Sequence, residues 1–236
     1  MTVVSAVPSS WGEAAKGIFH VKGLPWQAVR YNPMDKTQSD WTGFETAPTV
    51  IFNNTVPING WQNILEFAEA HVETPSLLPK TERELCLDLS DKFCGTDGLG
   101  WHRRLMAVHA GLTGNGGFAP PIAQYLGLKY GYSAKSMEYT NARMIELLTE
   151  FVSRLKAQEA SGSSYYVGES LTCVDIYSAC FMAFFDPLPD AHCPMHPKTR
   201  KVFETVYIET DHAFDPILLK HRDYIYENYL ELPLSL

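Results

Sequence analysis

The chain is 236 residues long, which is enough for one large domain or two small ones with a full-sized hydrophobic core. Hydrophobic residues make up 45% and charged residues 19%, and this composition excludes a disordered or fibrous protein. Nineteen basic and 27 acidic side chains give a formal net charge of -8, so we expect no nucleic-acid partner.

Sequence patterns also argue against membrane-spanning and disulfide-linked proteins. No window is apolar over the roughly 18 residues that a membrane helix needs, so we expect no membrane partner. Residues 1–8 lack the basic segment of a secretion signal, which favours a cytoplasmic location. The five cysteines are odd in number and form no C-x-x-C pair, so we expect free thiols.

Residues 1–73 alternate between strand and helix patterns. An apolar, β-branched run predicts a first strand, and the segment after it predicts a helix that ends at Gly23. Further apolar runs predict three more strands, and apolar residues at i, i+3, i+4 and i+7 predict a second helix from Trp61. The strands are predicted over 3–7, 26–31, 49–52 and 56–58, and the first helix over 13–22. The predicted order is therefore β-α-β-β-β-α.

A proline-bearing segment separates this unit from a region of helical periodicity. We therefore predict an N-terminal domain over 1–73, a linker over 74–79 and an all-helical domain over 80–236. Within the last, Pro120-Pro121 and the glycines before them predict a break. The helices are predicted over 81–93, 101–112, 136–157, 173–185, 199–208 and 216–230.

Three motifs stand within this layout: Ser9-Ser10-Trp11, Ala47-Pro48-Thr49-Val50 and Leu171-Thr172-Cys173-Val174-Asp175-Ile176. In the third, Thr172 and Asp175 have the spacing of a helix-capping box. With these motifs the sequence resembles the cytosolic glutathione transferases over nearly its whole length, without indicating a class. The resemblance implies an α+β fold, with a thioredoxin-like N-terminal domain and an all-α helical C-terminal domain. It also implies a cis peptide bond before Pro48.

The resemblance further implies where glutathione binds. Ser9 aligns with the active residue of the family's serine-type members, which donates a hydrogen bond to the glutathione thiolate, and Ser10 is the second candidate for this role. Trp11, Ala47 and Pro48 are implied glutathione-binding residues, with the backbone of Ala47 exchanging hydrogen bonds with the cysteinyl unit. The alternative for the two serines is that they only cap the helix.

One position departs from the family pattern. Where members carry an acidic residue followed by Ser, which hold the γ-glutamyl carboxylate, this chain has Asn59-Gly60. Gly60 keeps its backbone N–H and Asn59 can still form hydrogen bonds, so both stay candidate glutathione-binding residues. One charge-assisted hydrogen bond of about 1.5–3 kcal/mol is nevertheless missing. Weaker glutathione binding, or a different ligand, is therefore an open alternative.

A basic cluster lies beside an aromatic residue near the start of a later helix, in Trp101-His102-Arg103-Arg104. In the family this region faces the cleft between the domains. We therefore predict Trp101, Arg103 and Arg104 in the pocket of a second substrate, where an arginine would bind an anionic group. A solvated or ion-paired helix face is the alternative.

The resemblance implies a glutathione transferase-like enzyme that activates the thiolate of glutathione, its co-substrate, for attack on a small hydrophobic electrophile. A glutathione-dependent isomerase, an ether-cleaving or dehalogenating enzyme and a non-catalytic binding protein stay open as alternatives. Family members usually form dimers of two identical subunits, so a homodimer is expected. No metal is expected, because nearby prolines keep His192 and His196 from sharing one helix face.

Overall fold

The computed structural model describes residues 1–236, and its N-terminal part is built on a four-stranded mixed sheet. The strand order is β2-β1-β3-β4, in which β1 pairs parallel with β2, and β3 pairs antiparallel with both β1 and β4. The strands are β1 (Thr2–Val3), β2 (Val29–Arg30), β3 (Thr49–Val50) and β4 (Ile58–Asn59). The helices of this part are α1 (Ser10–Val21), α2 (Lys36–Thr42) and α3 (Trp61–His71).

This topology brings three separate chain segments to one end of the sheet. Because β1 and β3 are antiparallel, the segment that leaves β1 toward Ser9 lies at the end where Pro48 leads into β3. β4 is also antiparallel to β3, and Thr49 pairs with Asn59, so Gly60 follows at the same end. Pro48 follows a cis peptide bond, as the family resemblance implied. The starts of α1 and α3 therefore meet the loop before β3.

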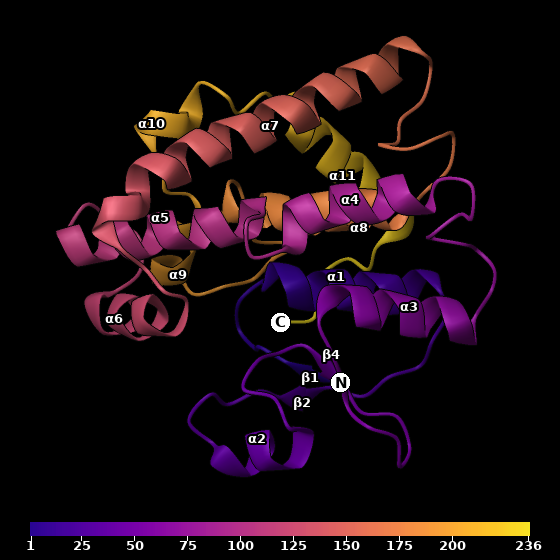
Figure 1. The fold of residues 1–236 in the computed structure, drawn as a ribbon, viewed down its shortest axis with the longest axis horizontal. Helices are drawn as coiled ribbons and strands as arrows, with labels where there is room; N and C mark the ends of the chain where they lie inside the picture. The colour runs from indigo at the N-terminus through magenta and orange to yellow at the C-terminus, as the bar shows by residue number, and fades with distance from the viewer.

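The predicted order β-α-β-β-β-α is wrong in one respect, because α2 lies between β2 and β3. This helix is short and polar, so it carries no apolar stripe to mark it. Local signals define it instead: the Asp35 carboxylate accepts a hydrogen bond from the Thr37 N–H at 3.0 Å, and Gly43 ends the helix with φ of 74°. Figure 1 shows α2 on the side of the sheet away from α1 and α3.

The rest of the chain is helical. Its helices are α4 (Arg83–Cys94), α5 (Leu99–Thr113), α6 (Pro120–Lys129), α7 (Met137–Ala160), α8 (Cys173–Phe181), α9 (Pro197–Phe203), α10 (Ile208–Asp211) and α11 (Ile217–Tyr229), with short 3-10 turns η1 (Ala134–Ser136) and η2 (Met182–Phe184). The predicted break is present over 114–119, but helix α6 was not predicted: Pro120-Pro121 occupy its first positions, where no intrahelical N–H is needed. The single helix predicted over 199–208 is two helices, α9 and α10.

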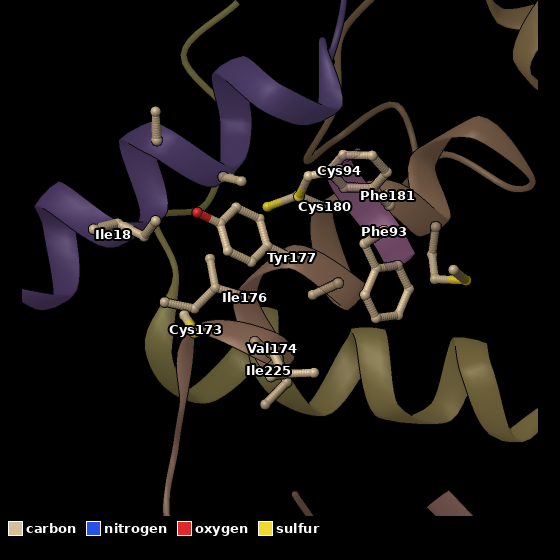
Figure 2. Close-up of a cluster of buried hydrophobic side chains, with 14 of the residues drawn as sticks. Ile18, Phe93, Cys94, Cys173, Val174, Ile176, Tyr177, Cys180, Phe181 and Ile225 are labelled. Carbon is tan, nitrogen blue, oxygen red and sulfur yellow. The ribbon is translucent and has the colours of Figure 1, made fainter. Parts of the chain in front are cut away.

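Helix α8 forms the centre of the core, and all nine of its residues are buried. Figure 2 shows Ile18 of α1, Phe93 of α4 and Ile225 of α11 around it. The Phe93 ring stacks on Phe151 of α7 with centroids 3.8 Å apart. The Tyr177 hydroxyl donates to the Trp61 carbonyl at 3.1 Å, which joins α8 to the start of α3. One core of 40 buried residues therefore runs through both parts of the chain.

The predicted capping box at the start of α8 is confirmed. The Asp175 carboxylate accepts hydrogen bonds from the Thr172 N–H at 2.8 Å and from the Thr172 hydroxyl at 3.0 Å. It also accepts from the Tyr166 N–H at 2.8 Å and lies 3.1 Å from the His221 Nε2. Because Asp175 is fully buried, this one carboxylate fixes the start of α8 against α11 and the loop before it.

Residues 72–82 join α3 to α4 without a helix or strand, and they include the predicted linker. All five cysteines are free and buried. No helix of the chain combines the length and the apolar character needed to cross a membrane.

Candidate functional site

A cavity of about 1160 Å³ opens between the end of the sheet and the helical region. It is lined by 33 residues, of which 20 are hydrophobic. One wall comes from the starts of α1 and α3 and the loop before β3, and the other comes from α4, α5, α6 and α9. This volume exceeds the roughly 300–1,000 Å³ typical of a single-ligand pocket, so the cavity has room for two small ligands side by side.

Ser9 is the residue before α1 and lines the cavity. Its extended backbone (φ -64°, ψ 112°) is that of a helix cap, but its hydroxyl makes no capping hydrogen bond. The first N–H groups of α1 therefore lack a side-chain acceptor at the end of the helix that carries partial positive charge. The Ser9 hydroxyl stays available to a ligand in the cavity.

Ser10 behaves differently from its neighbour. Its side chain is fully buried, it does not line the cavity, and its Oγ has no hydrogen-bond partner. The structure therefore does not bring Ser10 to the site, and Ser9 is the serine that reaches it. Trp11 does line the cavity, and its indole N–H donates to the Cys94 carbonyl at 3.0 Å, which fixes the start of α1 against the end of α4.

Ala47 and Pro48 form part of the cavity wall opposite the helices. Neither the N–H nor the carbonyl of Ala47 has a backbone partner within the chain, and no side chain bonds to it. A backbone segment with both groups free is the edge on which an extended peptide forms antiparallel hydrogen bonds. This segment therefore suits a peptide-like ligand.

Asn59 lies in the cavity wall, but its side chain bonds to its own protein. The amide donates to the Pro48 carbonyl at 3.0 Å and to the Thr49 hydroxyl at 2.9 Å, and its oxygen lies 3.3 Å from the Thr46 hydroxyl. Asn59 stays a candidate glutathione-binding residue by its place in the wall, but its side-chain amide already forms hydrogen bonds within the protein. Its side chain positions the loop that presents Ala47, a role that sequence reasoning missed.

Replacing Asn59 with Ala is expected to lower the free energy of unfolding by about 1–3 kcal/mol, because the partly buried Pro48 carbonyl and Thr49 hydroxyl lose their donor. Urea denaturation measures this change. Asn63→Ala is the matched control, since its exposed amide makes one hydrogen bond, to the Asn59 carbonyl. We expect a change within about 0.5 kcal/mol there. Equal losses in the two variants would contradict the role given to Asn59.

Gly60 is the residue before α3 and has a φ of 90°, in the region that favours glycine. It lines the cavity, and having no side chain it leaves the first N–H groups of α3 without a cap. A serine at this position would be strained by its Cβ. At Gly60 itself, a ligand meets only backbone donors.

The prediction that Arg103 lines the second-substrate pocket is wrong. Arg103 is buried on the other face of α5, where its guanidinium donates to the Phe184 carbonyl at 2.8 Å and to the Thr205 carbonyl at 2.6 Å. It also lies 4.2 Å from the Tyr207 ring centroid. Burial lowers the pKa of Arg103 to about 10, so it stays charged at neutral pH and holds η2 to the segment after α9.

Arg104 and Trp101 do line the cavity, from α5. The Arg104 Cζ lies 4.3 Å from the Trp11 ring centroid, 4.2 Å from that of Tyr130 and 5.9 Å from that of Trp101. Burial against these rings lowers the pKa of the Arg104 guanidinium, and no carboxylate faces it. The predicted pair of Trp101 and Arg104 is therefore brought together in the wall opposite Ala47.

Sequence reasoning missed the contributions of α6 and α9 to the cavity. Tyr130 follows α6 and packs against Arg104, while Lys129 donates to the Glu45 carbonyl at 2.6 Å and so joins α6 to the loop after α2. From α9, Lys198 and Phe203 reach the lining. The paired prolines of α6 are a helix-start signal that would have indicated this wall. No cluster of three or more potential metal-ligating side chains occurs in the chain.

No protein-family model matches the sequence, and no curated protein matches it. Solved structures do match. A glutathione S-transferase from Methylobacterium radiotolerans, in complex with glutathione sulfonate, is 16% identical with a TM-score of 0.61, over 100% of this chain and 96% of that protein. A glutathione S-transferase from Methylobacillus flagellatus, with glutathione bound, is 13% identical with a TM-score of 0.62, over 96% and 95% of the two chains.

A third similar structure is the maleylacetoacetate isomerase from Methylobacterium extorquens, with malonate and glutathione bound. It is 14% identical with a TM-score of 0.56, over 94% of this chain and 96% of that protein. All three similarities extend over the mixed sheet and the helical region together. The chain therefore has the fold of the glutathione transferases, a small mixed sheet with its helices joined to an all-helical region.

Proposed function

We propose that the chain is a glutathione-dependent enzyme whose cavity binds glutathione along the wall formed by Ser9, Ala47 and Gly60. The glutathione sulfur lies at the start of α1, and the γ-glutamyl carboxylate lies at the start of α3. The electrophile occupies the remaining space beside the helical wall. The similar structures support this proposal, since two of them are glutathione S-transferases with glutathione or its sulfonate bound.

The observation that carries the proposal is the pair of uncapped helix starts in one cavity. Ser9 precedes α1 and Gly60 precedes α3, both line the cavity, and neither provides a side-chain cap. Each helix start therefore presents free N–H groups and partial positive charge to an anion. Glutathione carries two anionic groups at opposite ends of its γ-glutamyl-cysteinyl half, a carboxylate and a thiolate, which matches this pair.

The free backbone of Ala47 supports the same orientation. Its N–H and carbonyl have no backbone partner, and they lie in the wall between the two helix starts. An extended cysteinyl unit would exchange two hydrogen bonds with them, as one strand does with the next. These contacts fix the tripeptide so that its sulfur reaches Ser9.

Ser9 acts by stabilising the thiolate. A free thiol has a pKa of about 8.5, and lowering it by two units requires about 2.7 kcal/mol. A hydrogen bond from the Ser9 hydroxyl to a charged sulfur contributes about 1.5–3 kcal/mol, and the start of α1 contributes about 0.3–1 kcal/mol. Together these contributions are large enough, and the released proton goes to solvent. The thiolate then attacks the electrophile.

The reaction class follows from the lack of a reactive cysteine. Cys94 lines the cavity, but burial raises the pKa of its thiol well above the ordinary value, so it is not a thiolate at neutral pH. A mixed disulfide with glutathione needs such a thiolate. Addition to the electrophile or displacement of a leaving group is therefore favoured, and isomerisation, ether cleavage and dehalogenation use the same activated sulfur.

Calorimetric titration with glutathione tests the proposal. We expect a dissociation constant between about 1 µM and 1 mM, the ordinary range for an enzyme substrate. The cysteinylglycine dipeptide lacks the γ-glutamyl carboxylate. Its dissociation constant is expected to be at least about tenfold higher, because the contact at α3 is lost. No heat of binding with glutathione would overturn the proposal, and equal affinities would overturn the contact at α3.

A further inference from the structure

We propose that the electrophile is an apolar molecule carrying a carboxylate, and that Arg104 binds this carboxylate. The inference rests on the proposed function only where it treats this ligand as the electrophile; the carboxylate site itself needs no glutathione.

Arg104 is a charged side chain without a polar partner. Its guanidinium contacts the rings of Trp11 and Tyr130, at 4.3 Å and 4.2 Å from their centroids, and it makes no hydrogen bond or ion pair within the chain. Aromatic rings contact the flat faces of a guanidinium and leave its N–H edge free. Arg104 also lines the cavity, so we infer that a ligand there can reach this edge.

Two neighbouring basic residues, in contrast to Arg104, do have polar partners within the chain. Arg103, one residue earlier, donates to two backbone carbonyls, and Lys129 donates to the Glu45 carbonyl. The charged residues that line the cavity are three basic ones, Arg104, Lys129 and Lys198, and one acidic one, Asp91. The cavity therefore carries an excess of positive charge in a chain whose formal net charge is -8. An anionic ligand supplies the missing partner.

The geometry favours a carboxylate over a phosphate. One guanidinium edge matches two carboxylate oxygens in a planar, bidentate pair. Lys198, the other lining cation whose side chain lacks a polar partner, is exposed, whereas Arg104 is half-buried among aromatic rings. A phosphate dianion needs further donors, whereas the surrounding lining is apolar, with Phe118, Ile122 and Phe184 among its members. The same lining requires that the rest of the ligand be apolar.

The position of Arg104 places this ligand beside the reacting sulfur. Trp11 contacts the Arg104 guanidinium and lies two residues after Ser9, at the start of α1. A carboxylate on Arg104 therefore anchors the ligand next to the proposed sulfur position, while its apolar body lies along α5 and α6. Arg104 is thus a specificity-determining residue for the electrophile.

A pair of ligands that differ only in charge tests the inference without activity. We would titrate the protein calorimetrically with 2-naphthoate and with its neutral amide, each with and without saturating glutathione. The naphthoate is expected to bind about tenfold tighter or better than the amide, because only the anion pairs with Arg104. Equal affinities of the two ligands for the wild-type protein would overturn the inference, and this result needs no variant.

Arg104→Met keeps much of the side-chain length and removes the charge. It is expected to abolish the preference for the naphthoate and to leave the glutathione dissociation constant within about twofold of wild type. Arg104→Lys, which keeps the charge but not the planar edge, is expected to retain part of the preference and covers the case in which the Met variant fails to fold. A full preference for the naphthoate in Arg104→Met would overturn the inference. The inference would also fall if this variant lost as much affinity for glutathione as for the naphthoate.

Failure of the proposed function gives a different result. If glutathione produces no heat while the naphthoate preference is present in wild type and absent in Arg104→Met, the carboxylate site stands and the glutathione proposal falls. If glutathione binds and wild type shows no preference for the naphthoate, the glutathione proposal stands and the carboxylate site falls.

Discussion

Replacing Ser9 with Ala is expected to lower turnover about tenfold or more with glutathione and an acceptor electrophile, while the protein still folds. The variant removes the hydroxyl that donates to the thiolate, and a charge-assisted hydrogen bond of this kind contributes about 1.5–3 kcal/mol. The hydroxyl makes no capping hydrogen bond in the folded chain, so its loss has little effect on the stability of α1. Initial rates at saturating glutathione measure the effect.

Ser10→Ala is the matched control, because it deletes the same group one residue later. The Ser10 hydroxyl is buried without a partner and does not line the cavity, so its removal is expected to leave turnover unchanged. It is also expected to leave the free energy of unfolding unchanged or slightly higher, since an unpaired buried hydroxyl is lost. Equal turnover in Ser9→Ala and wild type would contradict the catalytic role of Ser9.

Replacing Asp175 with Ala is expected to lower the free energy of unfolding by about 3–5 kcal/mol, a large part of the stability of a typical domain. The carboxylate accepts from the Thr172 and Tyr166 N–H groups and the Thr172 hydroxyl, and it lies 3.1 Å from the His221 Nε2. All of these groups are buried, so water cannot replace the lost acceptor. Chemical denaturation followed by circular dichroism measures the change.

Thr172→Ala separates the cap from the wider network. It removes the hydroxyl of the capping box and leaves the Asp175 contacts with Tyr166 and His221, so we expect a loss of about 1 kcal/mol. Because α8 contacts α1, α4 and α11, the larger loss in Asp175→Ala should lower the melting temperature of the whole protein in one transition. A loss in Asp175→Ala no greater than that in Thr172→Ala would contradict the network role.

The sequence predicted those parts of the fold that depend on local signals. Periodic apolar residues marked α3, α4, α7 and α11, and the spacing of Thr172 and Asp175 marked the start of α8. The change of period at the proline-bearing segment indicated the order of the two regions, and the resemblance to a known family implied the cis peptide bond before Pro48. Helix α2 was missed because its residues, with Trp41 alone as a large apolar one, form no apolar stripe, and α6 was missed because Pro120-Pro121 indicated a break.

The candidate site was less predictable, because it depends on which way each side chain points. Ser9 and Ser10, like Arg103 and Arg104, are neighbours that lie about 100° apart around a helix axis, and the sequence does not fix which one meets a ligand. The structure places Ser9 and Arg104 in the cavity and their neighbours in the interior. The direction of the Asn59 amide also depends on tertiary structure, because it donates to the hydroxyl of Thr49, its cross-strand partner. The homodimer and the cytoplasmic location stay predictions.

The pKa of the glutathione thiol in the complex is the most direct test of whether the start of α1 and the Ser9 hydroxyl stabilise the thiolate. The ultraviolet absorbance of the thiolate, followed against pH with the protein in excess over glutathione, gives this pKa. We predict a value about one to two units below the 8.5 or so of the free thiol in the wild-type complex, and a return toward the free value in Ser9→Ala. A bound thiol that titrates like free glutathione in the wild-type protein would contradict the account.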